Sequence, residues 1–194
     1  VERINRITAQ RVRDVAEHRR VVNLFAYVGG FSVHALAGGA HEVWSVDLAA
    51  PALRDAERNV ELNGLPSELH RTVEADVFEV LPRWAAEGER FDLTVLDPPS
   101  LARAKRQRER AWNAYRRLNA DAARLTASGG LLATASCTAQ VDPKAFEQAV
   151  RAGLRDAGRS ARIVHRGGHG LDHPVRRSFP EGRYLKFLLL QLDD

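Results

Sequence analysis

The chain has 194 residues, 44% of them hydrophobic and 28% charged, with 29 basic and 25 acidic residues. This size and composition predict one ordinary globular domain, exclude a disulfide-stapled miniprotein, and include no apolar run long enough to cross a bilayer. One cysteine, Cys137, allows neither an internal disulfide nor a cysteine-based zinc cluster, so we expect a cytoplasmic protein that uses no membrane and no metal.

Helical patterns alternate with short apolar runs that indicate buried strands along the whole chain. The expected helices are 3–18, 31–37, 51–63, 78–87, 107–126 and 143–157. The expected strands are 21–26, 42–47, 72–75, 91–96, 131–136, 161–165 and 184–192. Gly129 and Gly130 are expected to stop the fifth helix. Repeated strand–helix–strand units predict an α/β fold with a mostly parallel sheet covered by helices on both faces.

Ligands of such sheets bind beyond the carboxyl ends of the strands, so the residues there are the first candidates for a site. Gly29 and Gly30 follow the first strand, where glycines let the main chain approach a ligand and the next helix offers free N–H groups. Asp47 ends the second strand, 18 residues after Gly29. An acid at that distance can accept hydrogen bonds from both hydroxyls of a ribose, and its alternative role is to cap the next helix. Asp76 after the third strand could hold an adenine amino group or could equally be a helix cap.

The fourth and fifth strands end in a more specific pattern. Asp97 is followed by Pro98 and Pro99, which remove two N–H donors and fix the acid rigidly at the edge of the sheet. Cys137 follows the fifth strand rather than lying within it, which argues against the ordinary buried role of a free cysteine. If the two strands are neighbours, a carboxylate and a thiol share one crevice.

Positive charge is concentrated in one segment, 101–118, where seven basic residues and a single acid give a local balance of +6. The basic residues are Arg103, Lys105, Arg106, Arg108, Arg110, Arg116 and Arg117. Such a segment is expected to contact a polyanion such as nucleic acid, with a solvated helix face as an equally weighted alternative. Trp112 and Tyr115 in the same segment could stack on bases or pack in the core.

Several motifs together resemble the bacterial 23S rRNA cytosine-C5 methyltransferases. They are residues 23–32, Asp47, Asp97-Pro98-Pro99, Ser136-Cys137-Thr138, Asp172-His173-Pro174 and residues 180–186. The resemblance covers nearly the whole chain and implies a Rossmann-like class I methyltransferase fold of seven strands, the last antiparallel. Residues 1–194 would form the catalytic domain, preceded in a longer protein by an RNA-binding PUA domain. The lack of methionine agrees with this, because Val1 cannot be a translation start.

The resemblance also implies the cofactor, S-adenosylmethionine, and the residues that hold it. These cofactor-binding residues are Phe25, Tyr27, Gly29, Gly30, Phe31, Asp47, Leu48, Asp76, Val77 and Asp97. The substrate would be a single-stranded or irregular region of 23S rRNA, and a homodimer is left open. The residues expected to contact it are Pro98, Pro99, Ser100, Arg106, Arg108 and His173.

By the same resemblance, Cys137 and Asp97 are the catalytic residues. Cytosine C5 is a poor nucleophile, and addition of the Cys137 thiolate to C6 would activate it. Asp97 would bind the N3 and amino edge of the base. Ser100 stands where related enzymes carry a second cysteine, so the group that removes the C5 proton is not identified. Two alternatives are a methyltransferase of the same fold acting on another base or a small molecule, and a noncatalytic RNA-binding domain.

Overall fold

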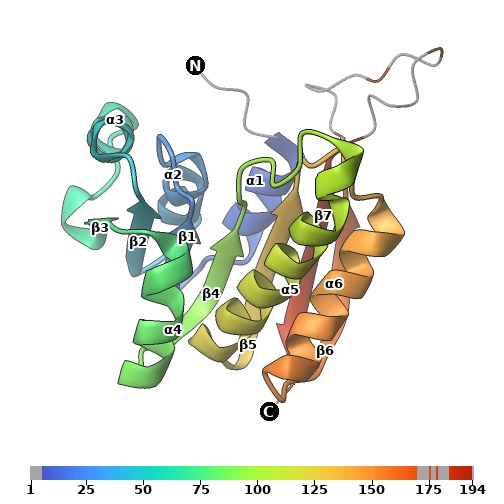
Figure 1. Ribbon diagram of the computed structural model, residues 1–194. Helices are drawn as coiled ribbons and strands as arrows, with labels where there is room; N and C mark the ends of the chain where they lie inside the picture. The colour runs from blue at the N-terminus through green and yellow to red at the C-terminus, as the bar shows by residue number, and fades with distance from the viewer. Residues whose placement is uncertain (1–5, 170–174, 176–177, 179–183, 194) are drawn as a thin grey trace.

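A seven-stranded sheet in the order β3-β2-β1-β4-β5-β7-β6 forms the centre of the computed structural model (Figure 1). The structure describes residues 6–169, 175, 178 and 184–193. The strands are β1 (Arg20–Leu24), β2 (Glu42–Asp47), β3 (His70–Glu74), β4 (Phe91–Leu96), β5 (Thr126–Ser136), β6 (Ala161–Gly167) and β7 (Lys186–Leu192). The helices are α1 (Arg6–Asp14), α2 (Gly30–Ala37), α3 (Ala50–Leu62), α4 (Val77–Glu87), α5 (Arg108–Leu125) and α6 (Pro143–Asp156), with short 3-10 turns η1 (Ser67–Leu69) and η2 (Lys105–Gln107).

The pairing of the strands confirms the predicted fold class. β3, β2, β1, β4 and β5 run parallel, and β7 is antiparallel to both β5 and β6. The order of the strands reverses between β1 and β4, which is the switch point where ligands of open α/β sheets bind.

Apolar side chains on alternate residues of the strands build a separate core on each face of the sheet. Val22 of β1 packs with α4, α5 and α6 on one face, whereas its neighbour Val21 packs with α1, α2 and α3 on the other. Figure 1 shows α4, α5 and α6 side by side on the face turned toward the viewer. Because both faces are covered, the central strands are near-continuous buried runs, whereas the edge strand β6 alternates between half-buried and exposed residues.

The link between α5 and β5 differs from the prediction. The helix ends at Leu125 and the strand begins at the next residue, so Gly129 and Gly130 lie inside β5 and do not stop the helix. The β4–β5 register shifts at this point. A Cβ atom on Gly130 would lie 2.9 Å from the Ala127 carbonyl oxygen and 3.0 Å from that of Asp92, so glycine is required by close backbone contact.

The other predicted elements are present with shifted ends. The first helix ends at Asp14 rather than at residue 18, and the last strand begins at Lys186 rather than at residue 184. None of the helices in the described ranges is long and apolar enough to span a membrane.

Candidate active site

A cavity of about 760 Å³ opens at the carboxyl ends of the parallel strands. It is lined by twelve of the residues predicted for the site, namely Phe25, Tyr27, Gly30, Phe31, Asp47, Leu48, Asp76, Val77, Asp97, Pro98, Pro99 and Cys137. It is also lined by residues that the sequence reasoning did not select, namely Thr8, Ala26, Val28, Ala75, Phe78, Tyr184 and Leu185. The structure therefore brings the glycine loop, the acids and the cysteine into one site.

The loop between β1 and α2 is held in an unusual backbone conformation. Phe25 and Tyr27 have positive φ angles of 59° and 48°, in the left-handed region that side chains other than glycine rarely adopt. The Asp47 carboxylate holds this loop, because one oxygen accepts a hydrogen bond from the Tyr27 N–H at 2.8 Å. Its other oxygen accepts one from the Ala49 N–H at 2.9 Å. Asp47 is thus fixed by two backbone groups at the end of β2.

Helix α3 begins at Ala50 and Ala49 is its N-cap residue, without a side-chain cap. The alternative role of Asp47 as the N-cap of this helix is therefore wrong. Its carboxylate points back across the edge of the sheet to the β1–α2 loop, and its ribose-binding role stays a prediction.

Gly29 has a packing role in the loop. Its φ is +74°, and a Cβ atom there would lie 2.6 Å from the Cβ of Ala56 in α3. The residue does not line the cavity, whereas Gly30 does. Gly29 therefore allows the loop to pack against α3, and its role in cofactor binding stays a prediction.

A chain of buried polar side chains lies beneath the loop. The Asn23 amide donates to the Ser32 hydroxyl at 2.9 Å, and Ser32 is hydrogen-bonded to Ser45 at 2.7 Å. Ser45 in turn contacts Nε2 of His70 at 2.7 Å. The chain joins β1, α2, β2 and β3. Burial lowers the pKa of His70, which favours the neutral imidazole that such a chain needs.

Apolar side chains form one wall of the cavity next to Asp76. The rings of Phe25 and Phe78 meet edge to face with centroids 6.0 Å apart. Leu48, also lining the cavity, is 68% exposed at its rim. Asp76 accepts a hydrogen bond from the Phe78 N–H at 2.8 Å and so caps α4, while its residue also lines the cavity. Both roles considered for Asp76 are compatible with this position.

Asp97 follows β4 at the inner end of the cavity. Burial raises the pKa of its carboxyl to about 6. Pro98 and Pro99, which follow it, have no N–H to offer, and the structure records no hydrogen bond from any described residue to this carboxylate. The carboxylate oxygens therefore stabilise the fold through no hydrogen bond among the described residues, and they line the cavity.

Cys137 follows β5, which is the neighbour of β4, and its thiol is half-buried. Burial and the Asp97 carboxylate raise the pKa of the thiol, and the Lys186 ammonium acts in the opposite direction. The next residue, Thr138, accepts a hydrogen bond from the Leu101 N–H at 3.0 Å and pairs with the Tyr115 hydroxyl at 2.7 Å. The segment after Pro99 is thus tied to the turn that carries the cysteine.

Of the residues predicted to contact substrate, Pro98 and Pro99 line the cavity, and three others lie outside it. Ser100 does not line the cavity, and its hydroxyl donates to the Ala102 carbonyl at 3.3 Å. Arg106 and Arg108 are exposed outside the cavity, and Arg108 pairs with Asp142 at 3.0 Å. His173 lies outside the described residues.

The two aromatic residues of the basic segment belong to the core. Tyr115 is fully buried, and its ring meets that of Phe146 edge to face with centroids 5.3 Å apart. Trp112 is partly buried against the same core. Stacking of Tyr115 on bases is therefore wrong, and the core-packing alternative is confirmed for it.

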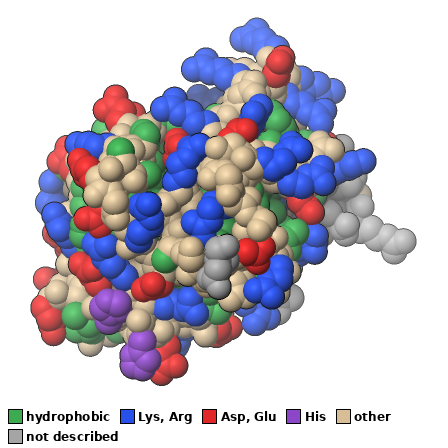
Figure 2. Space-filling model, turned by 90° about the horizontal axis from the view of Figure 1, so that it is seen from below, with side chains coloured by type: hydrophobic (Ala, Val, Ile, Leu, Met, Phe, Trp, Pro, Cys, Tyr) green, Lys and Arg blue, Asp and Glu red, His purple; other side chains and the backbone are tan. Residues whose placement is uncertain are grey.

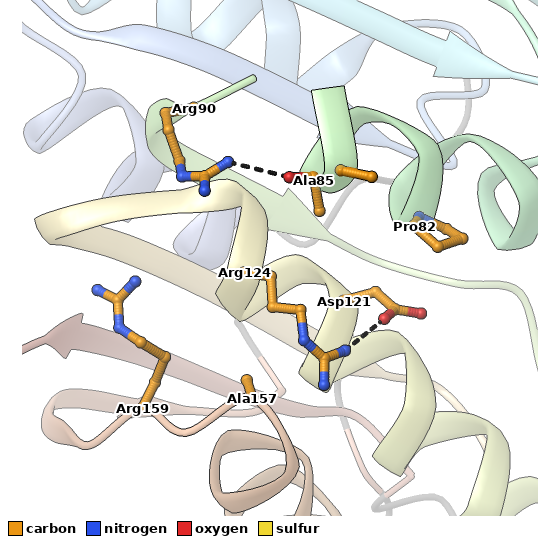
Figure 3. Close-up of a pocket in the computed structure, with 8 residues that line it drawn as sticks. Pro82, Ala85, Arg90, Asp121, Arg124, Ala157 and Arg159 are labelled. Atoms are coloured by element: carbon orange, nitrogen blue, oxygen red, sulfur yellow. Dashed lines mark hydrogen bonds and ion pairs between the residues drawn. The ribbon is translucent and has the colours of Figure 1, made fainter. Parts of the chain in front are cut away.

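A second hollow lies away from this site, between α4, α5 and the chain after α6 (Figure 3). Its three arginines all donate to backbone carbonyls. Arg124 donates to the Asp156 carbonyl at 2.6 Å, and Arg90 to the Glu89 carbonyl at 2.7 Å. Arg159 donates to three further carbonyls. The hydrogen bonds of these three arginines account for the hollow.

Seen from below, the surface mixes basic and acidic side chains without a continuous patch of one sign (Figure 2).

The geometry of the main cavity fits S-adenosylmethionine. Asp47 offers carboxylate oxygens at the end of β2, the Phe25 and Phe78 rings give an apolar wall for a flat heterocycle, and Asp97 lies beyond them. The volume is in the range of small-molecule sites.

Known proteins with similar sequences are ribosomal RNA methyltransferases. The chain is 47% identical over 184 residues to a ribosomal RNA large subunit methyltransferase of Deinococcus radiodurans, covering 95% of this chain and 45% of that protein. It is 42% identical over 182 residues to the ribosomal RNA large subunit methyltransferase I of Aeromonas hydrophila, covering 94% and 46%. The chain therefore spans less than half the length of these curated relatives.

Solved structures agree with the fold, and a family model identifies the chain. The crystal structure of the protein SMU.776 in complex with SAH superposes on this chain with a TM-score of 0.85. The two chains are 25% identical, and the match covers 96% of this chain and 49% of that one. NSun6 from Pyrococcus horikoshii superposes with a TM-score of 0.73 at 19% identity over 98% and 52%. The model of S-adenosylmethionine-dependent methyltransferases matches residues 3–166. With its cavity at the switch point of the sheet, the chain belongs to the S-adenosylmethionine-dependent methyltransferase family.

Proposed function

We propose that the protein methylates C5 of a cytosine in 23S rRNA through a covalent adduct on Cys137. The observation that carries the proposal is that Asp97 and Cys137 end adjacent parallel strands and line one cavity with the residues that fit the cofactor. The names of the relatives, ribosomal RNA large subunit methyltransferases, support an rRNA substrate.

The two residues match the chemistry that a cytosine requires. The Cys137 thiolate adds to C6, and the electron pair displaced from the C5–C6 double bond makes C5 nucleophilic. C5 would take the electrophilic methyl group that bound S-adenosylmethionine supplies, with the methyl–sulfur bond breaking and the neutral thioether as the leaving group. The C5 proton then leaves to solvent, and elimination breaks the S–C6 bond and returns the thiolate. Ser100 is not assigned to that proton, because its hydroxyl is bonded to its own chain outside the cavity.

Asp97 provides selectivity for cytosine. Negative charge develops on N3 when the thiolate adds to C6, and a carboxyl with a pKa of about 6 can donate a hydrogen bond there. Its other oxygen accepts from the exocyclic amino group. Uracil presents an N3–H and a carbonyl at the same edge, so it offers the opposite donor and acceptor pattern. The residue therefore both holds the base and assists the addition.

The basic segment provides the RNA contact. Arg103, Lys105, Arg106 and Arg110 are exposed and form no ion pair with a described residue. They lie in the part of the chain that follows the Asp97-Pro98-Pro99 turn and leads into α5. Arg108, Arg116 and Arg117 instead pair with acids of the chain. A base that enters the cavity must leave its stack, which costs least in loops and junctions.

The direct test is to map methylated bases after incubation of the full-length protein with 23S rRNA and labelled cofactor. We expect 5-methylcytosine. RNA that carries 5-fluorocytosine at the mapped position should trap the enzyme, because fluorine cannot leave C5 as a proton, and the adduct should survive denaturation. Methylation of guanine without any adduct would contradict the proposal and favour a different substrate for the same fold.

A further inference from the structure

Lys186 is a buried lysine beside the proposed nucleophile. It is the first residue of β7, lies opposite Ser136 of β5 in the antiparallel register, and is 6% exposed. A lysine buried to this degree needs partners for its ammonium. Here Nζ donates to the carbonyl oxygens of Thr138 and Val141, each at 2.7 Å.

The two accepting carbonyls belong to the turn that carries Cys137. This turn runs from the end of β5 to the start of α6, and the Val141 N–H also donates to the Thr138 carbonyl at 3.1 Å. The Lys186 ammonium group therefore joins two carbonyl groups of the turn to the first residue of β7. The position of the thiol depends on these two hydrogen bonds, because Cys137 lies between Ser136, which is fixed in the sheet, and Thr138.

The charges around the thiol give the ammonium a second role. Asp97 and Cys137 share the cavity, and a thiolate beside a carboxylate is unfavourable. Tyr115 also faces them, and burial raises the pKa of its phenol to about 12, so it stays neutral. Asp142 lies on the far side and attracts the lysine. Among the described residues, Lys186 is the cation that acts on the Cys137 thiol.

We propose that Lys186 is a positioning residue that fixes the turn carrying Cys137 and stabilises the thiolate with its positive charge. Burial lowers the pKa of Lys186 to about 8, so the ammonium remains the major form at neutral pH, and the thiolate raises that pKa in return. The inference rests on the proposed role of Cys137. It assigns no proton transfer to the lysine.

The single cysteine makes the test specific. Iodoacetamide alkylates the thiolate, so its rate on this chain against pH reports the thiol pKa of Cys137. Lys186→Met should raise that pKa and slow alkylation near neutral pH about three- to tenfold. Lys186→Arg should restore most of the rate. Lys144→Met, which removes an exposed lysine from α6, should leave it unchanged.

Methyl transfer by the full-length protein should respond in the same direction. The optimum of kcat for Lys186→Met should move to higher pH, while the affinity for S-adenosylmethionine stays that of the parent. An unchanged alkylation profile in a folded Lys186→Met variant overturns the proposal, whatever happens to methyl transfer. Conversely, if Cys137→Ala still methylates cytosine, the proposed function fails while the effect of Lys186 on the thiol pKa stands.

A second measurement decides the case if Lys186→Met does not fold. In Asp97→Asn the opposing carboxylate is gone, and the ammonium should attract an anionic reagent to the thiol. The ratio of the iodoacetate rate to the iodoacetamide rate should then exceed that of free cysteine. A ratio no higher than that of free cysteine overturns the proposal.

Discussion

The two halves of the site are built in different ways. On the β1–β2–β3 side, Asp47 and Asp76 both accept hydrogen bonds from backbone N–H groups, and a buried polar chain supports the loop. On the β4–β5–β7 side, Asp97, Cys137 and Lys186 are half-buried or buried ionisable groups whose pKa values are all shifted by burial. The two acids of the first half are already hydrogen-bonded before any ligand arrives, whereas the ionisable groups of the second half carry an electrostatic cost.

This difference matches two tasks. A binding half that is already hydrogen-bonded loses little entropy when the cofactor enters. A reacting half needs groups that change charge near neutral pH, and burial next to other charges is how proteins obtain them. Substitutions on the first side should therefore change affinity and stability, and substitutions on the second should change chemistry.

The largest effect is expected from Cys137→Ala. Methyl transfer should fall by at least about 1000-fold, because C5 stays unreactive without addition at C6. The cofactor affinity measured by calorimetry should stay that of the parent, and the melting temperature should change little, because the thiol lies beyond the end of β5. Residual transfer in proportion to the folded fraction would instead make Cys137 a core residue.

Gly29→Ala should destabilise the cofactor half by about 2–4 kcal/mol. The left-handed backbone and the contact with Ala56 both oppose a Cβ atom. Gly64→Ala is the matched control, since its φ is +64° but nothing lies within 4 Å of a Cβ there. It should cost only about 1 kcal/mol in chemical denaturation. Equal costs for the two variants would remove the packing role of Gly29.

Asp47→Ala should weaken cofactor binding by about 2–3 kcal/mol, or roughly 30- to 150-fold in Kd. The change removes ribose hydrogen bonds and also releases the Tyr27 and Ala49 N–H groups. The alkylation rate of Cys137 should not change, since the thiol belongs to the other half. An unaltered Kd in a folded variant would show that the acid only holds the loop.

Asp97→Asn should raise stability at neutral pH by about 1–3 kcal/mol while reducing methyl transfer. The folded-state pKa of about 6 lies above the unfolded value, so the ionised carboxylate costs stability as pH rises through 6. Below an unfolded pKa of about 4 both states are protonated and the gain should vanish. Denaturation curves at several pH values check this. A gain that does not depend on pH would mean that the carboxylate is not the cause.

The smallest effect concerns the basic segment. Replacing Arg103, Arg106 and Arg110 by Gln should weaken RNA binding for all sequences and reduce its salt dependence by about 0.7 per lost phosphate contact. Cofactor affinity should not change. Arg54→Gln with Arg58→Gln on α3 is the control, because both arginines are exposed on another helix. Equal salt slopes for the two sets would leave the segment as a solvated face.

Much of the fold and of the cofactor half could be predicted, because both depend on local pattern and on one topological rule. Apolar runs located the strands, and the carboxyl ends of parallel strands meet at one edge, so Asp47 and Asp97 fell into the same cavity. Lys186 could not be selected in this way. Its importance depends on the antiparallel pairing of β7 with β5, a contact between residues far apart in the chain.

The ends of helices and strands and the directions of side chains could not be predicted from the sequence either. Two adjacent glycines usually end a helix, yet here they allow close backbone contact inside β5. Tyr115 lies in a segment of arginines, but its position on the helix turns it toward the core. Helical spacing alone shows that one side of α5 is buried, and it does not show that the Tyr115 hydroxyl reaches Thr138.

The hydroxyl of Thr138 joins three parts of the chain at a single atom. It accepts from the Leu101 N–H, pairs with the Tyr115 hydroxyl, and belongs to the residue next to Cys137. A second link between the same two segments, the Arg108–Asp142 ion pair at 3.0 Å, is formed by exposed side chains. In the buried part of this contact, the segment after Asp97 and the turn with Cys137 therefore meet at one oxygen. Thr138→Val, which nearly keeps the shape of the side chain, would remove both hydrogen bonds at once. The residues that line the cavity would be unchanged, but the segment after Pro99 could move away from the turn that carries Cys137.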